Sequence, residues 1–264
     1  MSDISFVVAG FAVGLVVGLT GVGGGSLMTP ILIFFFGVKP YLAVGTDLLF
    51  AAFTKMGGTV HLARQNLVPW RVVGQLCAGS IPASLITLGV LRHLGPASTG
   101  VQKLMTTTLG MALLLTAAAT LYKAIRGKQL PRTVALGQEQ AAMQARHWSL
   151  PLVFGALIGT LVTLTSVGAG AIGVTVLLML YPLLPLQRIV ASDIAYAVPL
   201  TLVAGMGHAT LGSVDWPMLL KLLAGSLPGI WLGSRLMSKT PERPIRSLLS
   251  LLLAWAGTKL VMVA

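Results

Sequence analysis

Two glycine-rich turns are the places in this sequence where backbone groups are best arranged to bind a small anion. Their residues, in the first turn and then in the second, are Gly21, Gly23, Gly24, Gly25 and Ser26, followed by Ser166, Gly168 and Gly170. Glycine lets backbone N–H groups converge, and the start of a helix adds a dipole that favours an oxyanion. The alternative is that small residues simply permit close helix packing in lipid. Because the turn occurs twice, anion binding is the favoured interpretation.

Ionisable side chains within apolar segments form a second group of candidates. Asp47 and Asp193 occupy equivalent places early in two segments, where they could handle a proton or another cation. Each could instead cap the start of its helix, because Asp is a good N-cap residue. Lys55 lies near the middle of its segment, where an ammonium could contact an anion or pair with Asp47.

Two histidines are candidates for coupling or gating together with these acids. His61 and His208 follow Asp47 and Asp193 by 14 and 15 positions, which on a helix places each pair within about 60° of one face. One lining could therefore hold both types of residue, and histidine can carry a proton near neutral pH. Contacts with last-turn carbonyls or lipid headgroups are the alternative.

The sequence predicts no catalytic residue, metal site or cofactor. Four histidines and one cysteine without close ligand pairs make a zinc site improbable, and the first turn lacks the lysine of a nucleotide-binding loop. Ser26 with His61 or His208 could be imagined as a nucleophile and base. The repeated turn has Ala171 in place of Ser26, however, which suits two related binding sites better than one catalytic centre.

The elements that must position these residues are apolar and of bilayer length. Hydrophobic residues make up 55% of the chain and charged residues 9%, against about 25% charged in ordinary soluble domains. The clearest apolar runs cover 4–19, 72–91, 104–121 and 248–263. The basic residues behind the net charge of +12 lie between such runs, so they indicate membrane orientation and not nucleic-acid binding. We expect a multi-pass protein of a bacterial-type inner membrane.

The second half of the sequence repeats the first. The turn at 20–25 recurs at 165–170, Gly45-Thr-Asp47 recurs as Ala191-Ser-Asp193, and Gly79-Ser-Ile-Pro82 recurs as Gly225-Ser-Leu-Pro228. Five segments are expected in each half: 4–20, 26–38, 42–62, 71–92 and 102–123, then 150–166, 171–185, 190–211, 217–236 and 245–263. The second and seventh are shorter than the ~20 residues of a full span. The predicted fold is an all-α polytopic membrane protein of two pseudo-symmetric repeats with short or re-entrant glycine-linked segments.

The distribution of basic residues predicts that the two repeats are inverted. We expect a first repeat at 1–123, a basic connector at 124–148 and a second repeat at 149–264. The connector and a second basic cluster at 235–246 should both be cytoplasmic, which requires an even number of crossings between them. Five segments per half then give opposite orientations, as in many secondary transporters. Arg92 and Lys103 fall on the external side in this scheme.

These motifs together resemble the sulfite exporter TauE/SafE family of membrane permeases. The similar features span most of the chain outside the connector: Gly21-Val-Gly-Gly-Gly25 leading to Pro30, Ala43-Val-Gly-Thr-Asp47, His61-Leu-Ala-Arg64, Asn66-Leu-Val-Pro-Trp70 and Gly79-Ser-Ile-Pro82. The resemblance implies secondary transport of sulfite, sulfonates or related sulfur-containing organic anions, usually outward and without ATP. The family often shows Ser where Asp47 and Asp193 stand here.

The function expected from residues and resemblance is secondary export of a small anion by alternating access, with proton coupling as one option. An anion channel or a non-transporting membrane scaffold is the alternative, ahead of an intramembrane enzyme. The expected partners are the anion and the lipid bilayer, without nucleic acid. Substrate identity, coupling ion and oligomeric state stay open. Coupled flux in liposomes would distinguish a transporter from the other classes.

Overall fold

A computed structural model of the chain describes residues 3–20, 25–126, 149–168, 170–236 and 242–263. This part of the chain contains ten α-helices and no strand, which confirms the all-α class. Three predicted ligand residues, Gly21, Gly23 and Gly24, lie outside the described residues, as does most of the predicted connector.

The ten helices follow the ten predicted segments closely. They are α1 Asp3–Thr20, α2 Gly25–Phe36, α3 Pro40–Arg64, α4 Trp70–Leu94, α5 Thr99–Arg126, α7 Ser149–Thr165, α8 Ala171–Leu180, α9 Leu186–Thr210, α10 Trp216–Leu236 and α11 Glu242–Val263. The short second segment of each half is real, because α2 has 12 residues and α8 has 10. Helix α8 ends five residues earlier than predicted, since Pro182 disfavours helical backbone at Tyr181.

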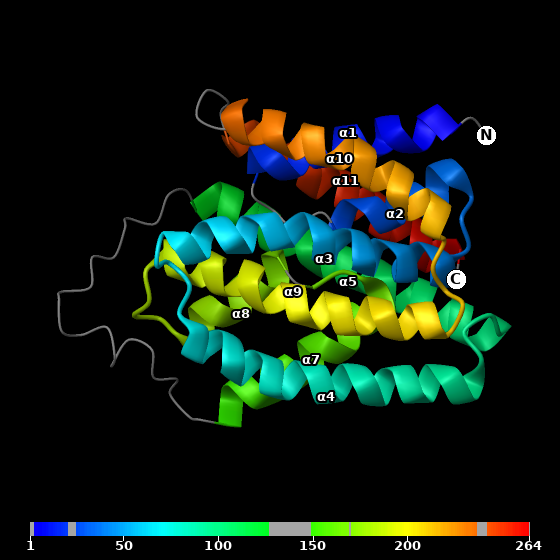
Figure 1. Ribbon diagram of the computed structural model, residues 1–264, viewed down its shortest axis with the longest axis horizontal. Helices are drawn as coiled ribbons and strands as arrows, with labels where there is room; N and C mark the ends of the chain where they lie inside the picture. Colours follow the sequence, from blue (N-terminus) through cyan, green and yellow to red (C-terminus); the bar gives the residue numbers. More distant parts are fainter. Residues whose placement is uncertain (1–2, 21–24, 127–148, 169, 237–241, 264) are drawn as a thin grey trace.

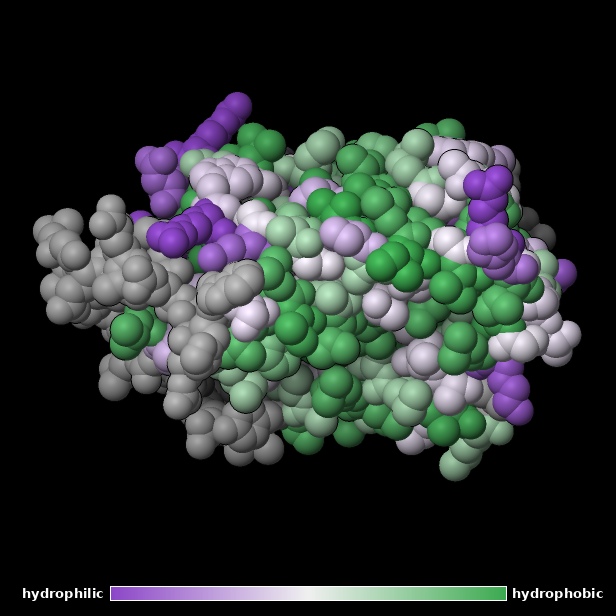
Figure 2. Space-filling model, turned by 90° about the horizontal axis from the view of Figure 1, so that it is seen from below, coloured by the Kyte–Doolittle hydropathy of each residue, from purple (hydrophilic) through white to green (hydrophobic). Residues whose placement is uncertain are grey.

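Several helices have the length and composition of membrane spans. The segments Trp70–Leu94, Thr99–Leu121 and Leu186–Thr210 are long and apolar enough to cross a bilayer, and shorter apolar helices include Ile4–Leu19 and Ser149–Thr165. Hydrophobic side chains cover the middle of the face in Figure 2, while hydrophilic ones gather toward its two ends. This distribution is typical of a protein that crosses a membrane along its long axis.

Equivalent helices of the two halves pack against each other in opposite directions. Helices α3 and α9 lie side by side near the centre (Figure 1). Gly45, near the start of α3, approaches Ser213 just after the end of α9, while the Thr59 hydroxyl, near the end of α3, lies 3.5 Å from the Ile194 carbonyl oxygen. The two helices are therefore antiparallel. Helices α5 and α11 also pack antiparallel, which is the arrangement that inverted halves require.

The two halves interlock through helices that pack backbone to backbone. Helix α1 packs along α10 of the other half, and α4 packs along α7. The α1–α10 contact is lined by glycines at every fourth position: Gly10, Gly14 and Gly18 on α1, with Gly225, Gly229 and Gly233 on α10. A Cβ atom at any of them would lie 2.0–2.5 Å from a backbone oxygen of the partner helix. Such spacing lets helices associate closely in lipid.

One end of the molecule gathers the helix ends that flank both predicted basic clusters. Helix α5 ends there and α7 begins there, and α10 also ends there (Figure 1). Helix ends and starts on this side carry Arg64, Arg71, Arg188 and Arg235. This common end supports the expectation that both clusters face one side of the membrane, and the positive-inside rule would make that side cytoplasmic.

We predict that the C-terminal ends of α3 and α9 face opposite sides of the membrane. Gln65 and Thr210 are exposed at these equivalent ends, and Cys77 is the only cysteine, so Cys77→Ala gives a clean background for Gln65→Cys and Thr210→Cys. A membrane-impermeant maleimide should label Thr210→Cys in intact cells and Gln65→Cys only in inverted vesicles. Labelling of both from the same side would contradict the inverted arrangement.

Candidate functional site

A buried lysine lies in the middle of α3. Lys55 is 8% exposed and follows Pro40 by fifteen residues, so it lies about 22 Å from the start of the helix and about 13 Å from its end. Its ammonium interacts electrostatically with the carboxylates of Asp193 in α9 and Asp47 in α3. The antiparallel α3–α9 pair thus brings one cation within electrostatic range of two acids, one from each half of the sequence.

Asp47 is buried where three segments meet. The Thr29 hydroxyl of α2 donates a hydrogen bond to its Oδ2 atom, and the Thr29 backbone N–H also donates to this carboxylate. Ser166, in the turn after α7, places its hydroxyl beside the same carboxylate without an aligned hydrogen bond. A residue of the second glycine-rich turn therefore contacts an acid of the first half. Sequence reasoning missed Thr29, because nothing in its spacing marks it.

The N-capping hypothesis for the two acids is wrong. Asp47 and Asp193 are each the eighth residue of their helices, about 10 Å inside the helix start. The N-cap residues are Lys39 and Pro185, without a side-chain cap hydrogen bond. Pro40 is pre-organised for the first helical turn, so α3 begins well before Asp47. Both acids lie at depth, where a carboxylate is costly and usually functional.

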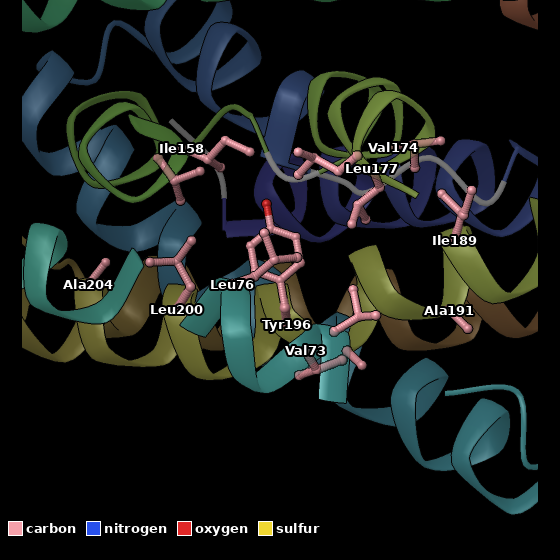
Figure 3. Close-up of a cluster of buried hydrophobic side chains, with 14 of the residues drawn as sticks. Val73, Leu76, Ile158, Val174, Leu177, Ile189, Ala191, Tyr196, Leu200 and Ala204 are labelled. Atoms are coloured by element: carbon pink, nitrogen blue, oxygen red, sulfur yellow. The ribbon is translucent and has the colours of Figure 1, made fainter. Parts of the chain in front are cut away.

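Asp193 meets the short helix of its own half, as Asp47 does. A Cβ atom on Gly173 in α8 would lie 2.0 Å from Asp193 Oδ1 and 3.2 Å from the Tyr196 hydroxyl, so this glycine makes room for both side chains. Figure 3 shows the Tyr196 ring among apolar side chains such as Leu76, with its hydroxyl pointing toward α7 and α8. Sequence reasoning missed Tyr196 and Gly173. Their one signal is that Tyr196 follows Asp193 by three positions on the same helix.

The glycine-rich turns are partly described. Gly168 and Gly170 have φ angles of 138° and 137°, which glycine adopts readily, and Gly25 begins α2. Ser26 belongs to α2, although its side chain lies outside the described atoms. Because the acids lie against α2 and α8, the protein's own carboxylates are close to where we expected a ligand anion. Lys55 is therefore the better candidate for direct contact with an anion.

The two histidines have different environments. His208 is fully buried and its Nε2 atom lies 2.9 Å from the Thr163 carbonyl oxygen in the last turn of α7, so Nε2 carries the proton that it donates. His61 is exposed, with Nε2 3.0 Å from Gln65 Nε2. His208 thus supports the end of α7, as the carbonyl-contact alternative anticipated. The two histidines do not form an equivalent pair.

Metal-ligand side chains are dispersed in the part of the chain that the structure describes. No group of three or more His, Cys, Asp or Glu residues there could hold a metal ion. The ionisable side chains that do come together are Asp47, Lys55 and Asp193.

Comparisons with known proteins find one family and several membrane transporter relatives. The family described as sulfite exporter TauE/SafE matches residues 6–260. The probable membrane transporter protein YjnA of Bacillus subtilis is 35% identical over 98% of this chain and 100% of its own length. YdhB and YunE of the same organism, also described as probable membrane transporter proteins, are each 26% identical over at least 95% of both chains. No solved structure gives a significant match.

We predict that His208→Ala lowers the free energy of unfolding by about 1–3 kcal/mol, because it leaves the buried Thr163 carbonyl without its donor. His61→Ala, at an exposed position, should change stability by no more than about 0.5 kcal/mol. Unfolding of both variants in mixed detergent–SDS micelles measures this difference. Equal effects of the two substitutions would show that the His208 contact contributes nothing.

Proposed function

The chain belongs to the sulfite exporter TauE/SafE family, and we propose that it exports a small sulfur-containing anion, such as sulfite or a sulfonate, as a secondary transporter. The observation that carries the proposal is Lys55, an ammonium buried in the middle of α3. A cation at such depth is expensive unless it serves a partner or a ligand. The family description supports the substrate class and the outward direction.

The charges around Lys55 set a condition for anion binding. One ammonium and two carboxylates give a formal charge of −1 when all three are ionised. Two unit charges 4 Å apart at an effective dielectric constant of 20 interact by about 4 kcal/mol, so a second nearby carboxylate outweighs much of the attraction to Lys55. Neutralising one acid removes that repulsion. We therefore propose that a coupling cation and the substrate anion occupy the site together.

A proton is the proposed coupling ion at Asp193. Its carboxylate faces the backbone of Gly173 and the Tyr196 hydroxyl, and Tyr196 belongs to a buried hydrophobic cluster. A protonated carboxyl needs less solvation than a carboxylate, so these surroundings accept the neutral form readily. Protonation of Asp193 would also release Lys55 from one of its two acidic partners and leave the ammonium available to the anion.

Alternating access is proposed to involve the two short-helix hairpins, α1–α2 and α7–α8. Each hairpin places a glycine-rich turn and a half-length helix beside a carboxylate of α3 or α9. Broken or short helices at a repeat interface are a common location for substrate and coupling-ion sites in secondary transporters. We also propose a location in the bacterial-type inner membrane with the central connector in the cytoplasm, which the basic residues at the helix ends flanking the connector support.

We predict that Lys55→Met abolishes flux of sulfite, thiosulfate or sulfoacetate in proteoliposomes, because it removes the buried cation while keeping the volume of the side chain. Lys39→Met, at the N-cap of α3, is the matched control and should transport normally. Counterflow of labelled substrate distinguishes a carrier, which exchanges anions, from a channel, which does not. Normal flux with Lys55→Met, or flux without counterflow, would contradict the proposal.

A further inference from the structure

The two oxygens of the Asp47 carboxylate have different surroundings. Oδ2 accepts the hydrogen bond from the Thr29 hydroxyl, whereas Oδ1 is buried without a hydrogen-bond partner among the described residues. The Ser166 hydroxyl lies beside this carboxylate and is also without a partner among those residues. Asp47 is 0% exposed and Ser166 is 5% exposed. Both oxygen atoms are therefore buried without an aligned hydrogen bond among the described residues.

Unsatisfied oxygens next to a buried negative charge favour a positively charged ligand. A buried polar atom without a partner costs its full desolvation, and a charged one costs more. Lys55 interacts electrostatically with Asp47 but also with Asp193, so it balances one of the two carboxylates. One further positive charge would make the group neutral.

We propose that Asp47 and Ser166 bind a Na⁺ ion, with Thr29 as the positioning residue. The carboxylate Oδ1 atom and the Ser166 hydroxyl oxygen are the direct ligands. Carboxylate and hydroxyl oxygens are donors for hard cations, and broken helices supply such sites in sodium-coupled transporters. Thr29 fixes the carboxylate through Oδ2. A divalent ion would exceed the formal charge of −1 and bring excess positive charge close to Lys55.

The sequence asymmetry between the two turns supports this location at Asp47. Ser166 stands where the first turn has Gly21, and its φ angle is 59°, a conformation that glycine adopts at lower cost. Serine at this position provides a hydroxyl that glycine lacks. Asp193 faces a different set of groups, which includes Gly173 and the Tyr196 hydroxyl.

A sodium site goes beyond the proposed function, and Na⁺ binding can be measured without any substrate anion. The full-length protein is purified in detergent at about pH 8, where proton competition is small. Its thermal unfolding is followed by tryptophan fluorescence in NaCl and in choline chloride at constant chloride. Binding of ²²Na⁺ is measured on the same samples. We expect a saturable rise in Tm with Na⁺ that choline does not reproduce.

Three variants separate ligand loss from misfolding. Ser166→Gly removes the hydroxyl but suits the positive φ angle, so it should fold normally in choline and lose at least tenfold in apparent Na⁺ affinity. Thr29→Val keeps the shape of the side chain and should also weaken Na⁺ binding. Ser80→Ala, at a buried serine of the α4–α7 contact, is the control and should bind Na⁺ like the unchanged protein.

Three results would overturn the sodium site. The first is an equal response of the unchanged protein to Na⁺ and choline. The second is stabilisation by lower pH to which Na⁺ adds nothing, which would assign a proton to Asp47. The third is normal ²²Na⁺ binding by Ser166→Gly. Loss of anion flux in Lys55→Met is a separate measurement, so failure of the transport proposal and failure of the sodium site can be told apart.

Discussion

The main electrostatic constraint in the structure is the buried ammonium of Lys55, which interacts with the carboxylates of Asp47 and Asp193. Lipid cannot solvate charged side chains, so an ammonium in the middle of a helix needs carboxylates from the protein. Helix α3 alone can supply only Asp47. The second acid comes from α9, because the two helices pack antiparallel at this level. The charges therefore require both halves of the sequence to meet at one place.

Close helix packing makes that meeting possible. In a bilayer, apolar side chains give little drive for helix association, so contact depends on backbone approach at small residues. The glycines of α1 and α10 and those of α4 and α7 allow it. These contacts join the two halves, and His208 supports the end of α7 from α9. Because Ser166 follows that helix end directly, the same packing holds its hydroxyl beside Asp47.

Much of the fold could be predicted from the sequence, because apolar runs and recurring motifs are local signals. The ten segments, two of them short, follow from these local signals. The depth of the acids was harder to judge, since Thr46-Asp47 and Ser192-Asp193 resemble N-caps, while Pro40 and Pro185 were the better markers of the helix starts. Motif recurrence also suggested equivalent histidines, but one is exposed and the other buried.

The composition of the site could not be predicted from either half alone. Thr29 reaches Asp47 within the first half, but Ser166 reaches it from the second, and the recurrence of motifs does not say which helices of the two halves pack together. Gly173 and Tyr196 could not be predicted for a similar reason, because their role depends on how α8 packs against α9. The regular glycine spacing in α1 and α10 was a readable signal of this interlocking.

An anion is expected to bind at Lys55 when a neighbouring carboxylate is neutralised. Calorimetric titration of the purified protein with thiosulfate, whose charge is constant between about pH 5 and about pH 8, tests this expectation directly at fixed Na⁺. The affinity for thiosulfate should rise as pH falls, because protonation of Asp193 removes the repulsion. Asp193→Asn should bind tightly at high pH with a weaker pH dependence. Affinity that is independent of pH, and no tighter in Asp193→Asn, would show that the carboxylates do not control anion binding at Lys55.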